Sequence, residues 1–89
     1  MTISGNPHKL AMDIALGYMS MTVATLKRYN APDLRTIDVN LNMVLRELRR
    51  EQVPLEDIMA LKARNMKIQR INQTLTILRS FCKKKRIVL

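Results

Sequence analysis

Residues 32–52 read PDLRTIDVNLNMVLRELRREQ and carry the clearest helical pattern in the chain. Apolar residues recur there at spacings of three and four, which places them on one face of an α-helix. That face consists of Leu34, Ile37, Leu41, Val44 or Leu45, and Leu48. Pro32 suits a first turn, where its missing N–H is not needed, and Asp33 suits the positive helix end. The pattern predicts an amphipathic helix with one buried face.

The segment before it also predicts a helix, over residues 7–28. Asn6 has the side chain of a good N-cap, and Pro7 suits the first helical position. Apolar residues occur nearly all round this segment, which indicates a helix that is buried centrally or shared with a second subunit. A domain of 89 residues has a thin stability margin, which dimerisation commonly offsets. We expect residues 7–52 to form an antiparallel helical hairpin that makes a homodimer, after a flexible lead over residues 1–5.

The composition favours an all-α fold. Seven Met and only two Gly favour helices over turn-rich sheets, and the 47% of hydrophobic residues can supply a core. Residues 10–26 are apolar enough to resemble a membrane segment. Asp13 interrupts them, however, and the run is shorter than the roughly 20 residues that a span needs. We expect one small helical domain over residues 1–89, without a membrane partner.

Charge is divided unevenly along the chain. Residues 1–60 carry seven basic and seven acidic groups, whereas residues 61–89 carry nine basic groups and no acid, so the net charge of +9 lies in the last third. Ordinary protein surfaces mix both signs. Uncompensated positive charge repels itself, and a bound polyanion relieves that repulsion and releases counterions. This distribution predicts a polyanion partner, with nucleic acid favoured over an acidic protein or a membrane surface.

Two interpretations of the basic third are open. In the first, residues 55–82 form a single long helix that begins with acids at its positive end. The apolar residues then follow a heptad pattern typical of a coiled coil. One heptad position holds Leu61, Ile68, Leu75 and Cys82, and the other holds Arg64, Ile71 and Leu78.

In the second interpretation, residues 55–86 contain two short helices separated by a tight turn at Thr76. Four features support it in order: Asn65-Met66-Lys67 as a helix end, Ile71 and Leu75 as buried residues, Thr76-Ile77 at the turn, and Arg79 near the start of the next helix. This order resembles the helix-turn-helix DNA-binding segment of resolvases, transposases and related homeodomain-like regulators. Three residues depart from that family: Asn72 replaces the usual Ala, Thr76 the usual Gly, and Leu78 the usual N-cap Ser or Thr. We favour this interpretation over the single helix.

The helix-turn-helix resemblance implies that the segment binds double-stranded DNA. Arg79 would contact a guanine in the major groove, and lysines would neutralise phosphates. The residues expected to bind nucleic acid are Lys67, Arg70, Arg79, Ser80, Lys83, Lys84, Lys85 and Arg86. The function expected is that of a small regulator of transcription or replication in a bacterium, phage or plasmid. The alternative is a helical protein-interaction module, an adaptor or inhibitor, that docks an acidic partner; RNA is a third possible polyanion.

We expect no enzymatic activity, no cofactor and no metal site. His8 is the only histidine and sits in the first turn of a predicted helix, where a solvated surface residue is expected. One Cys and one His supply too few ligands for a metal cluster, and no Gly-rich loop is present to hold a phosphate. Cys82 lies beside Lys83, which would lower the pKa of the thiol, but we expect a buried small apolar residue. A lone thiol suits a reducing compartment, so we expect a cytoplasmic protein.

Overall fold

Four α-helices make up the part of the chain that the computed structural model describes, residues 6–89. They are α1 (Pro7–Leu16), α2 (Val23–Leu26), α3 (Ala31–Arg50) and α4 (Ile58–Lys84). No strand occurs in this range, so the prediction of a small all-α fold is confirmed. The lead expected over residues 1–5 lies outside the described residues.

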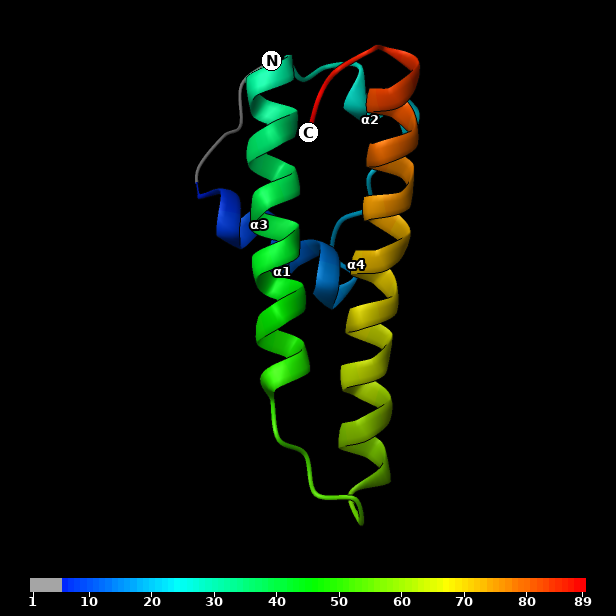
Figure 1. Cartoon of the computed structure of the whole chain (residues 1–89). Helices are drawn as coiled ribbons and strands as arrows, with labels where there is room; N and C mark the ends of the chain where they lie inside the picture. The colour runs from blue at the N-terminus through cyan, green and yellow to red at the C-terminus, as the bar shows by residue number, and fades with distance from the viewer. Residues whose placement is uncertain (1–5) are drawn as a thin grey trace.

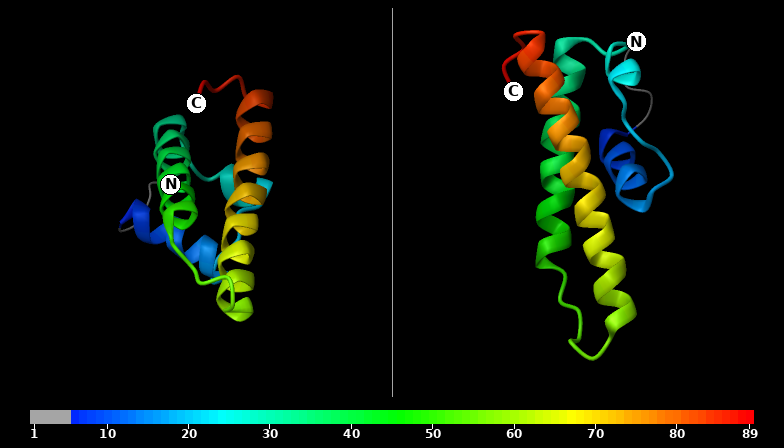
Figure 2. Two further views of the ribbon diagram at one scale, coloured as in Figure 1. Left: turned by 60° about the horizontal axis from the view of Figure 1, so that its bottom comes forward. Right: turned by 90° about the vertical axis from the view of Figure 1, so that its right-hand side faces the viewer.

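The two long helices, α3 and α4, run antiparallel and are joined by residues 51–57 (Figure 1). α1 and α2 form a second layer on one face of this pair, where α1 packs against both long helices and α2 packs against α4 (Figure 2). The long antiparallel pair is thus α3 with α4, in place of the hairpin expected within residues 7–52. Its connected end extends beyond the second layer, which gives an elongated molecule of 44 × 25 × 19 Å.

The core lies between the α3–α4 pair and the second layer. Its side chains come from all four helices and from the connection between α1 and α2. They are Ala11, Ile14, Ala15, Met21, Leu26, Leu34, Ile37, Leu41, Val44, Leu45, Leu48, Ile71, Leu75, Leu78, Phe81 and Cys82. The buried face predicted for residues 32–52 is confirmed, and both Val44 and Leu45 belong to it.

The prediction of one helix over residues 7–28 is wrong, because α1 ends before Gly17. This glycine has a φ of +85°, in the left-handed region that suits a residue without a Cβ. Its N–H donates to the carbonyl of Ile14 at 3.1 Å. The N–H of Tyr18 donates to the carbonyl of Asp13 at 2.9 Å, which completes a Schellman motif and closes the helix.

α4 is unbroken from Ile58 to Lys84, so the tight turn expected at Thr76 is absent. The Thr76 hydroxyl donates to the carbonyl of Asn72 at 2.9 Å, one helical turn back. Leu78, expected as the N-cap of a recognition helix, has 0% of its surface exposed. The interpretation of one long helix is therefore confirmed, and the favoured turn is corrected.

Packing explains why the helix continues through Thr76. The heptad residues Ile71, Leu75, Leu78 and Cys82 are all buried, so the apolar stripe crosses the expected turn without changing phase. A turn at Thr76 would rotate Leu78 and Cys82 away from the core. Threonine is only a few tenths of a kcal/mol less favourable in a helix than most residues, about 0.7 kcal/mol below Ala at most. That local preference is small beside the burial of two core side chains.

Thr76→Gly is expected to lower the free energy of unfolding by about 1 kcal/mol, because glycine is unfavourable in an exposed helix interior. Thr76 is exposed, so the change removes little packing. Thr76→Ala is the matched control and should be neutral or stabilising. Urea unfolding followed by circular dichroism compares the two variants. A Gly variant more stable than the Ala variant would contradict the continuous helix.

Candidate nucleic-acid interface

One end of the molecule collects six exposed basic side chains. Residues 83–86 stand at the end of α4 and just after it. α2 packs against α4 near this end, and Lys27 and Arg28 follow α2 directly (Figure 1). We call this set the basic end; it consists of Lys27, Arg28, Lys83, Lys84, Lys85 and Arg86.

Sequence analysis missed Lys27 and Arg28 because residues 1–60 are neutral when summed. Three of the seven acids in that range, Glu51 and the Glu56-Asp57 pair, lie on the connection at the opposite end of the molecule. They balance the formal charge of the two basic residues without being near them. The available signal was the adjacent basic pair itself, which lies between α2 and the start of α3 at Ala31.

Lys27 and Lys85 line the same surface hollow, which has a volume of about 370 Å³. Its apolar wall includes Phe81, which is 8% exposed. The full lining is Lys27, Tyr29, Leu34, Phe81, Lys85 and Ile87. The hollow therefore joins charges from both halves of the sequence around an apolar wall.

A second hollow, of about 270 Å³, also uses Phe81 and lies between α2 and α4. Val23 contributes to it from α2. The residues from α4 are Thr76, Ile77, Ser80, Phe81 and Lys84. Ser80, predicted to bind nucleic acid, is exposed at this hollow, next to the basic end.

Arg79 lies one turn before Lys83 on α4, so the two side chains are neighbours on the helix surface. The Nε of Arg79 is 4.0 Å from Oδ1 of Asp38 on α3. The Arg79 side chain is 60% exposed, and an ion pair of this length at such a site contributes little. Arg79 is thus near the basic end and only weakly held.

Arg70 and Lys67, both predicted to bind nucleic acid, lie apart from the basic end. Lys67 precedes Lys83 by 16 positions, about 24 Å along a helix. Nη1 of Arg70 donates to the carbonyl of Ala15 at 3.0 Å, and the guanidinium lies against Gly17. Arg70 thereby satisfies a carbonyl that the end of α1 leaves without a helical partner, and it joins α1 to α4.

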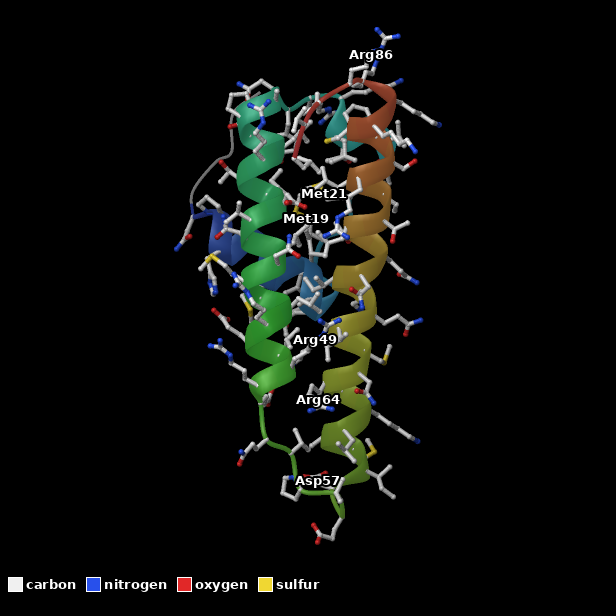
Figure 3. The ribbon with its side chains drawn as sticks, in the orientation of Figure 1. Met19, Met21, Arg49, Asp57, Arg64 and Arg86 are labelled. Carbon is white, nitrogen blue, oxygen red and sulfur yellow. The ribbon has the colours of Figure 1, made fainter. Side chains whose placement is uncertain are left out.

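Arg86 has a strained backbone, with a φ of +57°. Its N–H donates to the carbonyl of Lys83 at 3.2 Å, and the N–H of Ile87 donates to that of Cys82 at 2.8 Å. These two hydrogen bonds form the same Schellman motif that closes α1 at Gly17. Here arginine occupies the position that favours glycine. Within residues 6–89, Arg86 is the one non-glycine residue with positive φ. Figure 3 shows its side chain directed away from the end of α4.

Arg86→Gly is expected to raise the free energy of unfolding by about 1 kcal/mol, because glycine adopts positive φ without strain. Arg86→Gln removes the same charge and keeps the strain, so it should leave stability nearly unchanged. Guanidinium unfolding of both variants measures the difference. Equal stability of the two variants would mean that Arg86 is not strained.

The residues after Arg86 fix the basic end to the core. Ile87 packs against the buried cluster, and its side chain helps line the larger hollow. Nε of Arg35 on α3 donates to the carbonyl of Val88 at 2.8 Å. These contacts hold the segment after α4 against α3, so the backbone that carries the cations of residues 83–86 is fixed at its end.

His8 and Cys82, the two residues considered above for catalysis or metal binding, both make structural contacts. His8 Nε2 lies 3.3 Å from each carboxylate oxygen of Glu47, so this side chain joins α1 to α3. Cys82 is 1% exposed, as predicted. Burial raises the pKa of the Cys82 thiol, the Asp38 carboxylate adds to this effect, and the Arg35 guanidinium opposes it. A thiol kept protonated in this way is a poor nucleophile.

Neither a membrane-spanning helix nor a cluster of metal ligands occurs within residues 6–89. No helix in this range is long and apolar enough to cross a bilayer. Within the same range, no group of three or more His, Cys, Asp or Glu side chains is placed to hold a metal ion. Comparison of the chain with protein-family models, with curated proteins and with solved structures finds no match.

Proposed function

We propose that this protein binds double-stranded DNA through its basic end, as a small regulator of transcription or replication in a bacterium, phage or plasmid. The observation that carries the proposal is the meeting of Lys27 and Lys85 at one hollow, which adds two cations from residues 1–60 to those of residues 83–86. Six exposed cations at one end repel one another. DNA phosphates relieve this repulsion, and the release of condensed counterions favours binding.

The unbroken α4 changes how DNA would be contacted. Without a tight turn, no separate recognition helix is presented, so contacts to phosphates supply most of the affinity. Arg79 remains the best candidate for a base contact, since it lies one turn before Lys83 and is loosely paired with Asp38. The end of α4 would approach the groove, with Lys83 and its neighbours on the backbone.

Binding to duplex DNA at a series of salt concentrations tests the proposal. The logarithm of the association constant should fall linearly with the logarithm of the salt concentration, with a slope of about −0.9 for each phosphate contact. Arg79→Ala should weaken binding and reduce any preference between sequences by about 1–3 kcal/mol. Absence of binding to any duplex at low salt would overturn the proposal.

The two hollows beside Phe81 favour a second candidate, docking of an acidic protein. Each hollow combines apolar walls with a lysine, Lys84 in one and Lys85 in the other, which suits an amphipathic acidic helix. Val23 is 50% exposed in the smaller hollow, so Val23→Lys would obstruct it without emptying the core.

Val23→Lys separates the two candidates. The variant adds a cation next to the basic end and should leave DNA binding equal or tighter. Docking of an acidic helix into the hollow should instead be lost. A salt-insensitive complex with an acidic protein, which DNA does not displace and which Val23→Lys abolishes, would favour the second candidate.

A further inference from the structure

The end of the molecule opposite the basic end exposes apolar side chains. No side chain in residues 51–70 is buried, and we call this segment the arm. It comprises the connection between α3 and α4 and the first turns of α4. Its large exposed apolar residues are Leu55 at 83%, Ile58 at 60%, Met59 at 76% and Met66 at 51%. Such a cluster at one end of a small protein marks an interaction surface.

The second layer contacts the arm at Arg70, its last residue, which donates to the carbonyl of Ala15. α1 and α2 cover one face of the α3–α4 pair nearer the other end, and the arm extends past them (Figure 2). Inside the arm, the heptad position nearest α3 is held by Arg64, whose Nη1 donates to the carbonyl of Glu51 at 3.1 Å. Figure 3 shows Arg64 directed from α4 into the space between the long helices. A guanidinium therefore occupies one inner position of the arm, while Leu55, Ile58, Met59 and Met66 lie exposed on its outside.

We propose that the arm is the contact between two copies of this chain, related by a two-fold axis with their α4 helices antiparallel. Met59, Ala63 and Met66 are spaced by four and three residues, so they share one flank of α4. With the axis beside Ala63, Met59 of each copy meets Met66 of the other. The small Ala63 side chain lets the helices approach to about 8 Å at the axis. The spacing is thus self-complementary, as a two-fold contact requires.

The charges of the arm also favour a second copy of this chain as its binding partner. Glu56 and Asp57 lie at its tip, and Lys67 lies ten residues after Asp57, about 15 Å along the helix. In the antiparallel arrangement the tip acids of each copy come within one turn of Lys67 of the other. An acidic protein partner would instead be repelled by the acids at the tip.

The arrangement also separates the strongest like charges. The basic end lies at the opposite end of the α3–α4 pair from the arm (Figure 1). Two copies joined arm to arm carry their basic ends far apart, where mutual repulsion is smallest and mostly screened by salt. The sequence pattern predicts a dimer contact within residues 7–52. The arm overlaps that range only at residues 51 and 52.

Sedimentation equilibrium of the full chain without DNA tests the contact, from about 1 μM to about 1 mM protein. The expected mass is that of two chains, and Met59→Lys should shift it to one chain. The matched control is Val39→Lys on α3, since Val39 is 55% exposed and distant from the arm; it should leave the mass unchanged. A one-chain mass over the whole range, or equal loss with Val39→Lys, would overturn the proposal.

A charge swap tests the antiparallel arrangement separately. Glu56→Lys and Lys67→Glu should each weaken self-association by up to about fivefold, and the double variant should restore it. If the double variant lost as much self-association affinity as the two single variants together, the antiparallel arrangement would be wrong. Circular dichroism checks that each variant keeps the helical content of the parent. Because no DNA is present, failure here leaves the proposed function untouched.

Discussion

Leu78→Ala is expected to lower the free energy of unfolding by about 3 kcal/mol. Leu78 has 0% of its surface exposed and belongs to the stripe of α4 that packs into the core. Truncation removes apolar contacts and leaves a cavity that the neighbouring helices close only in part. A domain of this size is stable by roughly 5–10 kcal/mol, so the loss is a large fraction of the total.

The neighbouring residue supplies the control for this prediction. Ile77 is 36% exposed at the hollow between α2 and α4, and Ile77→Ala replaces a β-branched residue by the best helix former. Its effect on unfolding should stay within about 1 kcal/mol. Urea denaturation with circular dichroism measures both variants. If Leu78 were the N-cap of a recognition helix, Leu78→Ala would cost no more than Ile77→Ala.

The regularity of each segment decided how well its helix could be predicted. Residues 32–52 have a sharp apolar face, and α3 buries that face while running from Ala31 to Arg50. Residues 7–28 are apolar all round, so periodicity indicated no face and no boundary. The stop comes from a single backbone position, Gly17 at φ +85°, which closes α1 through two local hydrogen bonds. Glycine after a run of helical residues was the available signal.

The tight turn that the helix-turn-helix resemblance implied is absent for a different reason. The features behind the resemblance are local, whereas the continuity of α4 depends on residues brought together by the fold. Leu75, Leu78 and Cys82 pack against distant helices, and this long-range packing outweighs the weak turn preference at Thr76. The heptad pattern contained the correct information, because it specified one phase through the whole segment.

The candidate interface could be predicted only in part from the sequence. Residues 83–86 are adjacent in the chain, so their charge is visible without a fold. Lys27 joins them because α2 packs against α4, which depends on the break after α1 that periodicity did not reveal. Arg70 lies apart from the basic end and donates to the carbonyl of Ala15, which the same break leaves without a helical partner. The break at Gly17 therefore underlies the placement of both Lys27 and Arg70.

Replacing Lys83, Lys84, Lys85 and Arg86 by Gln is expected to weaken DNA binding by about 10³-fold at 0.1 M salt, because each lost phosphate contact removes roughly 0.9 from the salt slope. The four side chains are exposed, so the fold should persist. A control with the same loss of charge replaces four exposed cations away from the basic end: Lys9, Arg46, Arg49 and Arg50. That control should lose less than about tenfold, since only long-range attraction falls. Fluorescence anisotropy over a salt series measures both.

Lys27 and Arg28, which follow α2, give the sharpest test of the basic end. Lys27→Gln with Arg28→Gln should lower the salt slope by about 1.8, although these residues lie more than 50 positions before Lys83 in the chain. The reason is the hollow that Lys27 and Lys85 line together, which places both on the one surface proposed to contact phosphates. An unchanged slope would mean that DNA follows α4 alone. An equal loss from Lys9→Gln with Arg46→Gln, two exposed cations away from the basic end, would mean that net charge, and not the basic end, determines binding.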